Sequence, residues 1–202
     1  MARYLGPTCR RCRTSGEKLY LKGDKCYTDK CAVTRRKSKP GGNKMSRQKI
    51  SDYAIQLREK QKLKYIYGIL EAQFYNYYKE ASSKSGVTGE MLLQSLERRL
   101  DNVVYRMGLA KSRNQARQLV RHGHVTIGGR RVDIPSYRVK GGEELVFSKE
   151  IGIAKENVKN ASPPSWLDFD RENLKGKIVS IPNREAVDYE INEQLVVEFY
   201  SR

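Results

Sequence analysis

Residues 91–147 constrain the fold of this chain more strongly than any other stretch. Their centre predicts one helix, because Ser112 followed three positions later by Gln115 is a capping box and Gly123 can provide a left-handed C-terminal cap. Apolar residues at helical spacing predict a preceding amphipathic helix that ends at Gly108, through Leu92, Leu93, Leu96, Leu100, Val103, Val104 and Met107. Residues 125–127, 130–134 and 144–147 alternate like short strands between glycine-pair turns. We therefore expect two or three helices against a short, curled antiparallel sheet.

The central helix also carries a row of cations. Its apolar residues Ala116, Leu119 and Val120 share one stripe, and Arg113, Arg117 and Arg121 recur every four residues on another face. Like charges at this spacing repel each other by roughly a few tenths of a kcal/mol per pair. The row therefore predicts an anionic ligand, with the role of Arg121 open between a contact and simple solvation.

The net charge and its distribution along the chain indicate what kind of partner the protein binds. The 202 residues carry a formal net charge of +17, and residues 1–50 contain fifteen Lys or Arg against three acidic residues. Such an excess at one end favours a polyanion-binding arm over an evenly solvated surface. Residues 34–44 have no apolar face and are broken by Pro40 and glycines, which disfavours a membrane-surface helix. We find no apolar run of the roughly 18 residues that span a bilayer and no signal peptide, so we expect a cytosolic protein without a membrane partner.

All four cysteines lie in this basic arm, at Cys9, Cys12, Cys26 and Cys31. Two close pairs separated by a short loop can bring four thiolates to one tetrahedral ion. Four unrelated thiols, two disulfides or an iron–sulfur cluster are the alternatives, and a cytosolic location disfavours the disulfides. The spacing predicts one structural Zn²⁺ that orders the arm, because protein ligands fill all four positions.

The remaining segments carry weaker signals. Residues 46–83 predict two packed helices on either side of a polar, lysine-rich link at residues 59–64. Tyrosines in this region could stack on bases, but an amphipathic core with surface hydroxyls is the better interpretation. In the tail, we expect a short turn at residues 166–170, a strand near residues 177–181, and a final strand or docked segment at residues 195–200.

No catalytic constellation accompanies these features. The chain has two histidines, His122 and His124, which flank Gly123, so a histidine-centred triad cannot be assembled elsewhere. A capping or packing role for these histidines is as plausible as contact with RNA. No phosphate-binding loop is present, since the glycine pairs precede strands. We therefore expect neither an enzyme nor a small-molecule substrate.

Three segments carry a family resemblance: Arg99-Leu100-Asp101-Asn102-Val103-Val104-Tyr105-Arg106-Met107-Gly108, residues 112–124 and Val132-Asp133-Ile134-Pro135-Ser136-Tyr137. They resemble the small-subunit ribosomal protein four (S-four) family, in its bacterial, zinc-bearing form. The resemblance also covers the first seven residues and the ending Leu195-Val196-Val197-Glu198-Phe199-Tyr200-Ser201. It implies an α+β fold with a zinc-bound basic arm at residues 1–45, a mainly helical domain at 46–90 completed by 180–202, and an inserted RNA-binding domain at 91–179 with its core at 98–150.

The same resemblance implies a function and a set of contacts. It implies a structural protein of the cytoplasmic small ribosomal subunit that binds the five-way junction in the 5′ domain of the ribosomal RNA early and nucleates assembly. It places the protein beside ribosomal protein five and the channel through which messenger RNA enters, and it implies repression of its own operon in many bacteria. The implied RNA-binding residues, together with the cations of the arm, are Arg10, Arg11, Arg35, Arg36, Lys37, Arg47, Arg99, Tyr105, Arg113, Arg117, His122, His124, Arg130 and Lys140.

These features predict recognition of folded RNA by shape and phosphate position rather than by base sequence. Two further classes stay open. RNA-modifying enzymes and tyrosyl-tRNA synthetases use a similar central unit, but with a large catalytic domain for which this chain has no room. A zinc-dependent DNA-binding regulator, or an RNA-binding accessory protein outside the ribosome, is the other alternative; the regulator would require a base-reading helix at the cysteines.

Overall fold

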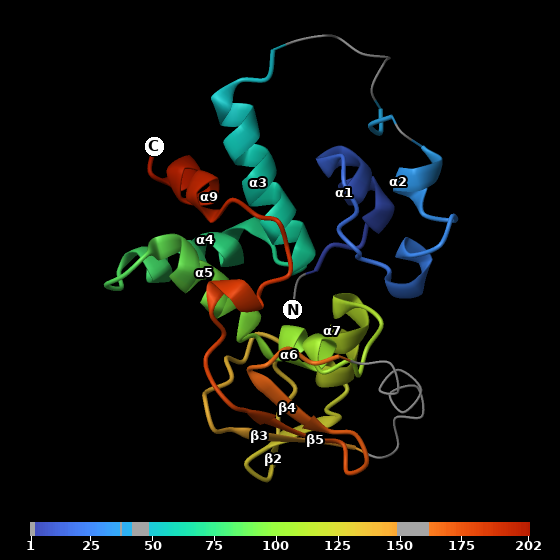
Figure 1. Ribbon diagram of the computed structural model, residues 1–202, viewed down its shortest axis with the longest axis vertical. Coiled ribbons are helices and arrows are strands. Elements are labelled where there is room, and N and C mark those ends of the chain that lie inside the picture. The colour runs from blue at the N-terminus through green and yellow to red at the C-terminus, as the bar shows by residue number, and fades with distance from the viewer. Residues whose placement is uncertain (1–2, 37, 42–48, 149–161) are drawn as a thin grey trace. The chain divides into compact units, whose positions relative to one another are not determined.

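The computed structural model describes residues 3–36, 38–41, 49–148 and 162–202. The chain divides into two compact units: unit 1 comprises Met1–Gly89 and Tyr189–Arg202, and unit 2 comprises Glu90–Asp188. Within the described residues there are eight α-helices and one five-stranded antiparallel sheet (Figure 1), which confirms the α+β class. None of the helices in these residues combines the length and the apolar character that crossing a bilayer demands. The division into arm, helical domain and inserted domain stays a prediction.

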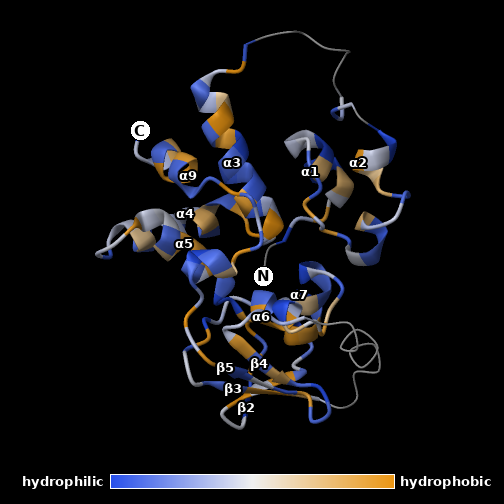
Figure 2. Ribbon diagram, in the orientation of Figure 1, coloured by the Kyte–Doolittle hydropathy of each residue, from blue (hydrophilic) through white to orange (hydrophobic). Residues whose placement is uncertain are grey.

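Unit 1 contains the arm and a set of packed helices. The arm forms α1 (Thr8–Ser15), a 3-10 helix at Gly23–Cys26 and α2 (Ala32–Arg35), and α1 packs against both α2 and α3 (Asp52–Ile66). Next along the chain are α4 (Glu71–Ser82) and the start of α5 (Thr88–Glu97). The C-terminal α9 (Glu193–Tyr200) packs on α3, and both helices alternate hydrophobic and hydrophilic residues (Figure 2). The core of this unit includes Leu63, Ile66, Ile69, Phe74, Tyr77, Ala81, Ile191 and Val196.

Two predictions for unit 1 are corrected. The polar link expected at residues 59–64 lies inside α3, because Lys60 and Lys62 are buried and paired: Lys60 Nζ lies 2.7 Å from Glu71 Oε1, and Lys62 Nζ lies 3.0 Å from Glu17 Oε1. The expected terminal segment at residues 195–200 is docked, but as helix α9 rather than a strand. The Asn192 side chain caps that helix by accepting hydrogen bonds from two backbone N–H groups.

Unit 2 contains the rest of α5, α6 (Leu100–Arg106), α7 (Arg113–Arg121), a 3-10 helix at Arg184–Ala186 and the sheet. The strands are β1 (Val125–Ile127), β2 (Arg130–Arg131), β3 (Glu144–Phe147), β4 (Leu167–Asp170) and β5 (Lys175–Ile178), in the order β2-β1-β3-β5-β4. Strands β1 and β3 confirm the predictions at 125–127 and 144–147, and β2 confirms two residues of the predicted return strand. The segment expected to turn at 166–170 is instead strand β4, because it alternates buried and exposed residues and pairs along β5.

One buried cluster holds unit 2 together. It joins the inner faces of α6 and α7 to the sheet, and its members are Leu100, Val103, Val104, Met107, Leu109, Ala110, Ala116, Val120, Val125, Ile127, Val139, Leu145, Phe147, Trp166, Leu167, Phe169, Leu174 and Ile178. The predicted inward stripe of α7 is confirmed, with Ala116 and Val120 fully buried and Leu119 partly buried against this cluster. The outward face of α7 is thereby left for polar residues.

The single helix expected to end at Gly108 is wrong, because the chain breaks at Arg98-Arg99 into α5 and α6. Arg99 has an extended backbone and forms a bridge with Arg138. The backbone N–H of Leu100 donates to the carbonyl of Tyr137 at 2.8 Å, so groups released from the helix find partners on a distant segment. Helical periodicity continues across such a break, and the sequence pattern therefore did not reveal it.

Candidate nucleic-acid interface

The α7 helix is capped as its sequence predicts. Ser112 Oγ accepts a hydrogen bond from the backbone N–H of Gln115 at 3.3 Å, and Gln115 Oε1 accepts one from the backbone N–H of Lys111 at 2.8 Å. At the other end, Gly123 has a φ of 73°, and its N–H donates to the carbonyl of Val120 at 2.8 Å. Both ends are defined by local chemistry, so the helix presents its side chains in fixed directions.

Two of the three α7 arginines point toward α6 instead of forming an open face. Arg117 is 7% exposed, and its Nη1 lies 3.5 Å from Asp101 Oδ2. Arg113 is half-buried, donates from Nε to Asn102 Oδ1 at 2.8 Å, and places its guanidinium 4.4 Å from the ring centroid of Tyr105. The prediction of a shared anion-binding row is therefore corrected for Arg113 and Arg117, because protein groups already engage both guanidinium groups. Contact of Arg113 and Tyr105 with RNA stays a prediction.

Arg99 lies entirely inside unit 2. Its side chain is 0% exposed and donates two hydrogen bonds to the carboxylate of Asp101, at 3.0 and 2.8 Å. A guanidinium in this position cannot reach a phosphate on the surface, so the predicted RNA contact of Arg99 is corrected to a structural ion pair. Its resemblance-based assignment rested on position in the motif, which carries no information about burial.

A second buried network lies beside this pair. Asn102 donates from Nδ2 to the Glu97 carbonyl at 2.9 Å and to Glu97 Oε2 at 2.7 Å, while its Oδ1 receives Arg113. Arg106 donates to the same Glu97 carboxylate from Nε at 3.1 Å and from Nη2 at 3.0 Å. Each buried carboxylate is thus paired with an arginine, as burial of charge requires.

The exposed face of α7 consists of residues that the sequence interpretation passed over. Within the helix, the spacing of four and three residues places Asn114, Gln118 and Arg121 on one side, and Lys111, which precedes the N-cap Ser112, is also exposed. Arg121, whose role was open, is exposed to solvent. This row is the complement of the apolar stripe at 116, 119 and 120, so the signal was present in the sequence. The prediction was based instead on the repeat of arginines at 113, 117 and 121.

The C-terminal end of α7 meets the β1–β2 hairpin through Arg131. Arg131 Nη2 donates to the carbonyl of His122 at 2.7 Å, and a Cβ added to Gly123 would lie 1.8 Å from Arg131 Nε. The guanidinium of Arg131 therefore occupies the space above Gly123, and its positive charge offsets the partial negative charge at the C-terminus of the helix.

The two predicted histidines flank this glycine. His122 is exposed and His124 is half-buried, with their ring centroids 6.1 Å apart. Sequence reasoning missed Arg131 and chose its exposed neighbour Arg130 in β2.

Lys140 lies on the surface of the same unit. Its side chain is exposed, and its backbone N–H donates to Glu143 Oε2 at 3.0 Å. Tyr137 donates from its hydroxyl to the other oxygen of Glu143 at 2.9 Å, which fixes the turn before β3. The ammonium group of Lys140 is thus presented from an ordered turn, and its contact with RNA stays a prediction.

The four cysteines of the arm are reduced and lie near one another. Cys12, Cys26 and Cys31 are buried, and the backbone N–H of Lys22 donates to Cys26 Sγ at 3.4 Å. Burial raises the pKa of the Cys12 thiol, and the neighbouring sulfurs of Cys26, Cys9 and Cys31 raise it further. In the part of the chain that the structure describes, no group of three or more His, Cys, Asp or Glu residues is arranged to hold a metal ion. The zinc site therefore stays a prediction.

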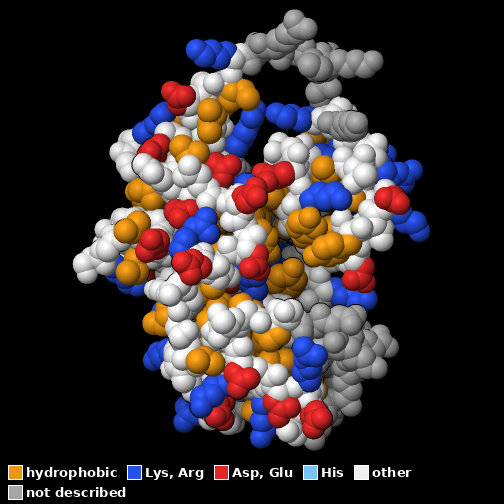
Figure 3. Space-filling model, in the orientation of Figure 1, with side chains coloured by type: hydrophobic (Ala, Val, Ile, Leu, Met, Phe, Trp, Pro, Cys, Tyr) orange, Lys and Arg blue, Asp and Glu red, His pale blue; other side chains and the backbone are white. Residues whose placement is uncertain are grey.

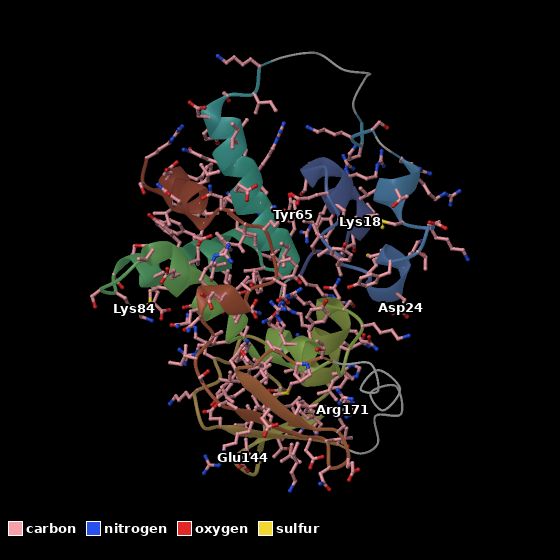
Figure 4. All side chains as sticks on the ribbon, viewed as in Figure 1. Lys18, Asp24, Tyr65, Lys84, Glu144 and Arg171 are labelled. Atoms are coloured by element: carbon pink, nitrogen blue, oxygen red, sulfur yellow. The ribbon has the colours of Figure 1, made fainter. Side chains whose placement is uncertain are left out.

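The cations of the arm fall into two groups. Arg10, Arg35 and Arg36 are exposed, and Lys and Arg side chains project from the outer edge of the arm near α2 (Figure 3). Arg11 instead lies against two tyrosine rings, 3.6 Å from the centroid of Tyr4 and 4.5 Å from that of Tyr65 on α3. Tyr65 is labelled in Figure 4. Burial lowers the pKa of Arg11, and the two rings hold the cation in place. Lys37 and Arg47 lie outside the described residues.

Comparison with known proteins accounts for the whole chain. Residues 3–97 match the ribosomal protein S4/S9 N-terminal domain, and residues 98–145 match the S4 domain. The chain is 53% identical to small ribosomal subunit protein uS4 of Pelotomaculum thermopropionicum, and 55% identical to uS4A of Symbiobacterium thermophilum and to uS4 of Thermus thermophilus. Each comparison covers 100% of both chains. On this evidence, the chain belongs to the uS4 family of small ribosomal subunit proteins.

Proposed function

We propose that this chain binds folded small-subunit ribosomal RNA along two surfaces: the exposed row of α7 with the β1–β2 hairpin, and the cationic arm. Membership of the uS4 family makes it a structural, non-enzymatic protein of the small ribosomal subunit in the cytoplasm. The identity of about 55% over the full length of uS4 proteins is the observation that carries this proposal. The net charge of +17 supports it, because a polyanion relieves the repulsion within such a chain.

Each surface contributes a different kind of contact. On unit 2, cations held by a capped helix and an ordered hairpin meet phosphates at fixed positions, and guanidinium groups can do so with two hydrogen bonds. On the arm, exposed arginines follow an irregular backbone. The proposed contact set keeps Arg10, Arg11, Arg35, Arg36, Lys37, Arg47, Tyr105, Arg113, His122, His124, Arg130 and Lys140, adds Lys111, Arg121 and Arg131, and leaves out Arg99 and Arg117.

The finer assignments rest on the resemblance of the sequence to its family. We propose that the RNA is the five-way junction of the 5′ domain and that binding occurs early in assembly. We also propose that this protein lies beside ribosomal protein five and the channel through which messenger RNA enters. Repression of its own messenger would use the same surfaces, because a folded messenger presents the same phosphates. Recognition by shape suits RNA helices, because side chains cannot reach the bases in their deep, narrow major groove.

Salt dependence tests the unit 2 surface directly. Lys111→Ala combined with Arg121→Ala should flatten the slope of log affinity against log salt by about 1.4, taking roughly 0.7 per phosphate contact. The matched control is Lys175→Ala with Lys177→Ala, which removes two exposed lysines from β5 and should leave the slope unchanged. The measurement is filter binding of a 5′-domain transcript. An unchanged slope in the Lys111→Ala/Arg121→Ala variant would show that these residues are not in the interface. Failure of the wild-type protein to bind the transcript would contradict the proposed function.

We also propose that Cys9, Cys12, Cys26 and Cys31 hold one structural Zn²⁺, as in the zinc-bearing branch of the family. Support comes from the spacing, from three buried reduced thiols and from the backbone N–H group that donates to Cys26. The ion would supply a cross-link for an arm with few buried apolar residues.

Native mass spectrometry tests the metal. One zinc per chain is expected, with weaker retention in Cys9→Ser and Cys26→Ser and unchanged retention in Ser15→Ala, which alters a neighbouring α1 residue without a thiol. Two disulfides, or the absorbance of an iron–sulfur cluster, would exclude the zinc assignment.

A further inference from the structure

We infer that Tyr20 and Tyr27, on the arm, form a stacking site for one unpaired base of the bound RNA. This inference rests on the proposed function and adds a base contact to an arm that otherwise offers cations. The Tyr27 side chain is 72% exposed, more than any other aromatic residue in the described part of the chain. A ring exposed to this extent offers most of its surface to a partner.

The two rings are already arranged as a pair. Their centroids lie 5.0 Å apart and their planes are inclined by 31°, so Tyr20 supports one side of Tyr27. The large exposed fraction of Tyr27 leaves most of its surface open to solvent. A base that stacks on the exposed ring would add to an existing ring pair and would not need to order a free side chain, which lowers the entropic cost of binding.

The backbone beneath the pair is held in an unusual conformation. Tyr20 has a φ of +49°, a left-handed conformation that is rare for a bulky residue. On either side, Leu19 is 2% exposed and the N–H of Lys22 donates to Cys26 Sγ at 3.4 Å, and Tyr27 directly follows that cysteine. Strain of this kind persists where surrounding structure enforces it, and it concentrates at binding sites. The local structure thus directs the Tyr20 ring toward Tyr27 at an energetic cost.

The surroundings favour RNA over an apolar protein partner. Exposed lysines at positions 18, 22, 25 and 30 outnumber the exposed acids Asp24 and Asp29, and Lys18 and Asp24 are seen on the arm in Figure 4. An apolar docking surface would require a contiguous patch of a few hundred Å², whereas here exposed charged residues lie close in the sequence to both rings. Aromatic rings among cations match the sites at which proteins bind unpaired bases, because every base offers a π-face and every nucleotide a phosphate.

Substitution at Tyr27 in the full-length protein tests the site. Tyr27→Ala and Tyr27→Leu should bind a transcript of the small-subunit 5′ domain about 5- to 150-fold more weakly, the range measured for loss of one stacked base. Tyr27→Phe should match the wild type, because it keeps the ring and loses the hydroxyl. Tyr53→Ala is the control, since Tyr53 is also exposed, at 50%, but lies on α3 outside the arm. The slope of log affinity against log salt should be unchanged in every variant, because none alters a charge.

Chemical probing of the same complexes identifies the ligand. One unpaired base should be protected by the wild type and by Tyr27→Phe, and reactive with Tyr27→Ala and Tyr27→Leu. If the wild type binds with the expected salt dependence and Tyr27→Ala binds equally well, the stacking site is overturned while the proposed function survives. Equal losses in Tyr27→Phe and Tyr27→Ala would also overturn it, because the hydroxyl rather than the ring would then carry the contact. If the wild type does not bind the transcript, both proposals fail.

Discussion

Two pairs of arginines, one in each compact unit, act in opposite ways. In unit 2, Arg99 and Arg117 are buried, and both approach the carboxylate of Asp101. In the arm of unit 1, Arg35 at the end of α2 and Arg36 directly after it are exposed. The same residue type therefore fixes an interior in the first pair and lies on the surface in the second.

This difference shows that a count of cations does not locate an RNA-binding surface. A buried guanidinium that is already paired with a carboxylate has given up its hydration, and breaking that pair costs more than a phosphate contact returns. An exposed guanidinium has little to lose and releases counterions from the RNA when it binds. Substitutions should therefore separate into those that destabilise the fold at buried arginines and those that weaken binding at exposed ones.

The largest expected effect is on the stability of unit 2. Asp101→Asn should lower the free energy of unfolding by about 3–5 kcal/mol, because it leaves the buried charge of Arg99 without its counter-charge. Urea denaturation measures the loss. The matched control is Asp168→Asn on the exposed side of β4, which should have a small effect. If the two substitutions cost the same, the arginines of unit 2 are not held by the buried carboxylate.

A smaller loss is expected where α7 meets the hairpin. Gly123→Ala and Gly128→Ala both place a side chain at positive φ and should each cost about 1–2 kcal/mol. Gly123→Ala should cost more, because its Cβ would collide with Arg131, whereas nothing lies within 4 Å of a Cβ at Gly128. Denaturation of the double variant Gly123→Ala/Arg131→Ala should recover the excess. If it does not, Arg131 does not occupy that space in solution.

The stability of unit 1 should depend on pH through the ion pairs of Glu71. Although partial burial opposes it, hydrogen bonds from Lys60, Lys64 and Tyr200 lower the pKa of Glu71 to about 2 from its usual 4.5. A carboxylate with a depressed pKa stabilises the fold fully above pH 4.5, and that contribution is lost as the pH falls from 4.5 through 2. The urea midpoint of Glu71→Gln should therefore lie below that of the wild type at pH 6 and approach it at pH 2. Asp29→Asn, an exposed substitution in the arm, should show no such convergence.

The smallest effect on stability is expected in the arm. Arg35→Ala with Arg36→Ala should change the free energy of unfolding by no more than about 0.5 kcal/mol, as is usual for exposed residues. The same variant should flatten the salt dependence of RNA binding by about 1.4, taking roughly 0.7 for each lost phosphate contact. Thermal melts and filter binding on one preparation would compare the two quantities. A destabilised variant with an unchanged salt slope would reverse the assigned roles of the two units.

Local patterns in the sequence correctly predicted the helix of residues 113–121, two strands of the sheet and the overall α+β class. Those features depend on near neighbours: a side chain that caps its own helix, a glycine that accepts a left-handed conformation, and alternation along a strand. The break at Arg98-Arg99 escaped prediction because its partner at Tyr137 lies far away in the sequence. The continuous α3 and strand β4 escaped it because the pairing of Lys60 with Glu71 and of β4 with β5 forms only when separate segments pack together.

The sequence by itself determined that the chain is a cation-rich, RNA-binding member of its family, because charge and motif are properties of the residues alone. Only the tertiary structure decided which cations are exposed and which are buried. Helical spacing at 113, 117 and 121 is compatible with any face, and the position of Asp101 and Asn102 on α6 turns Arg113 and Arg117 inward. The same packing leaves Lys111 and Arg121 exposed, and the hairpin brings Arg131 onto Gly123. Burial and pairing are decided by contacts between elements that local periodicity cannot encode.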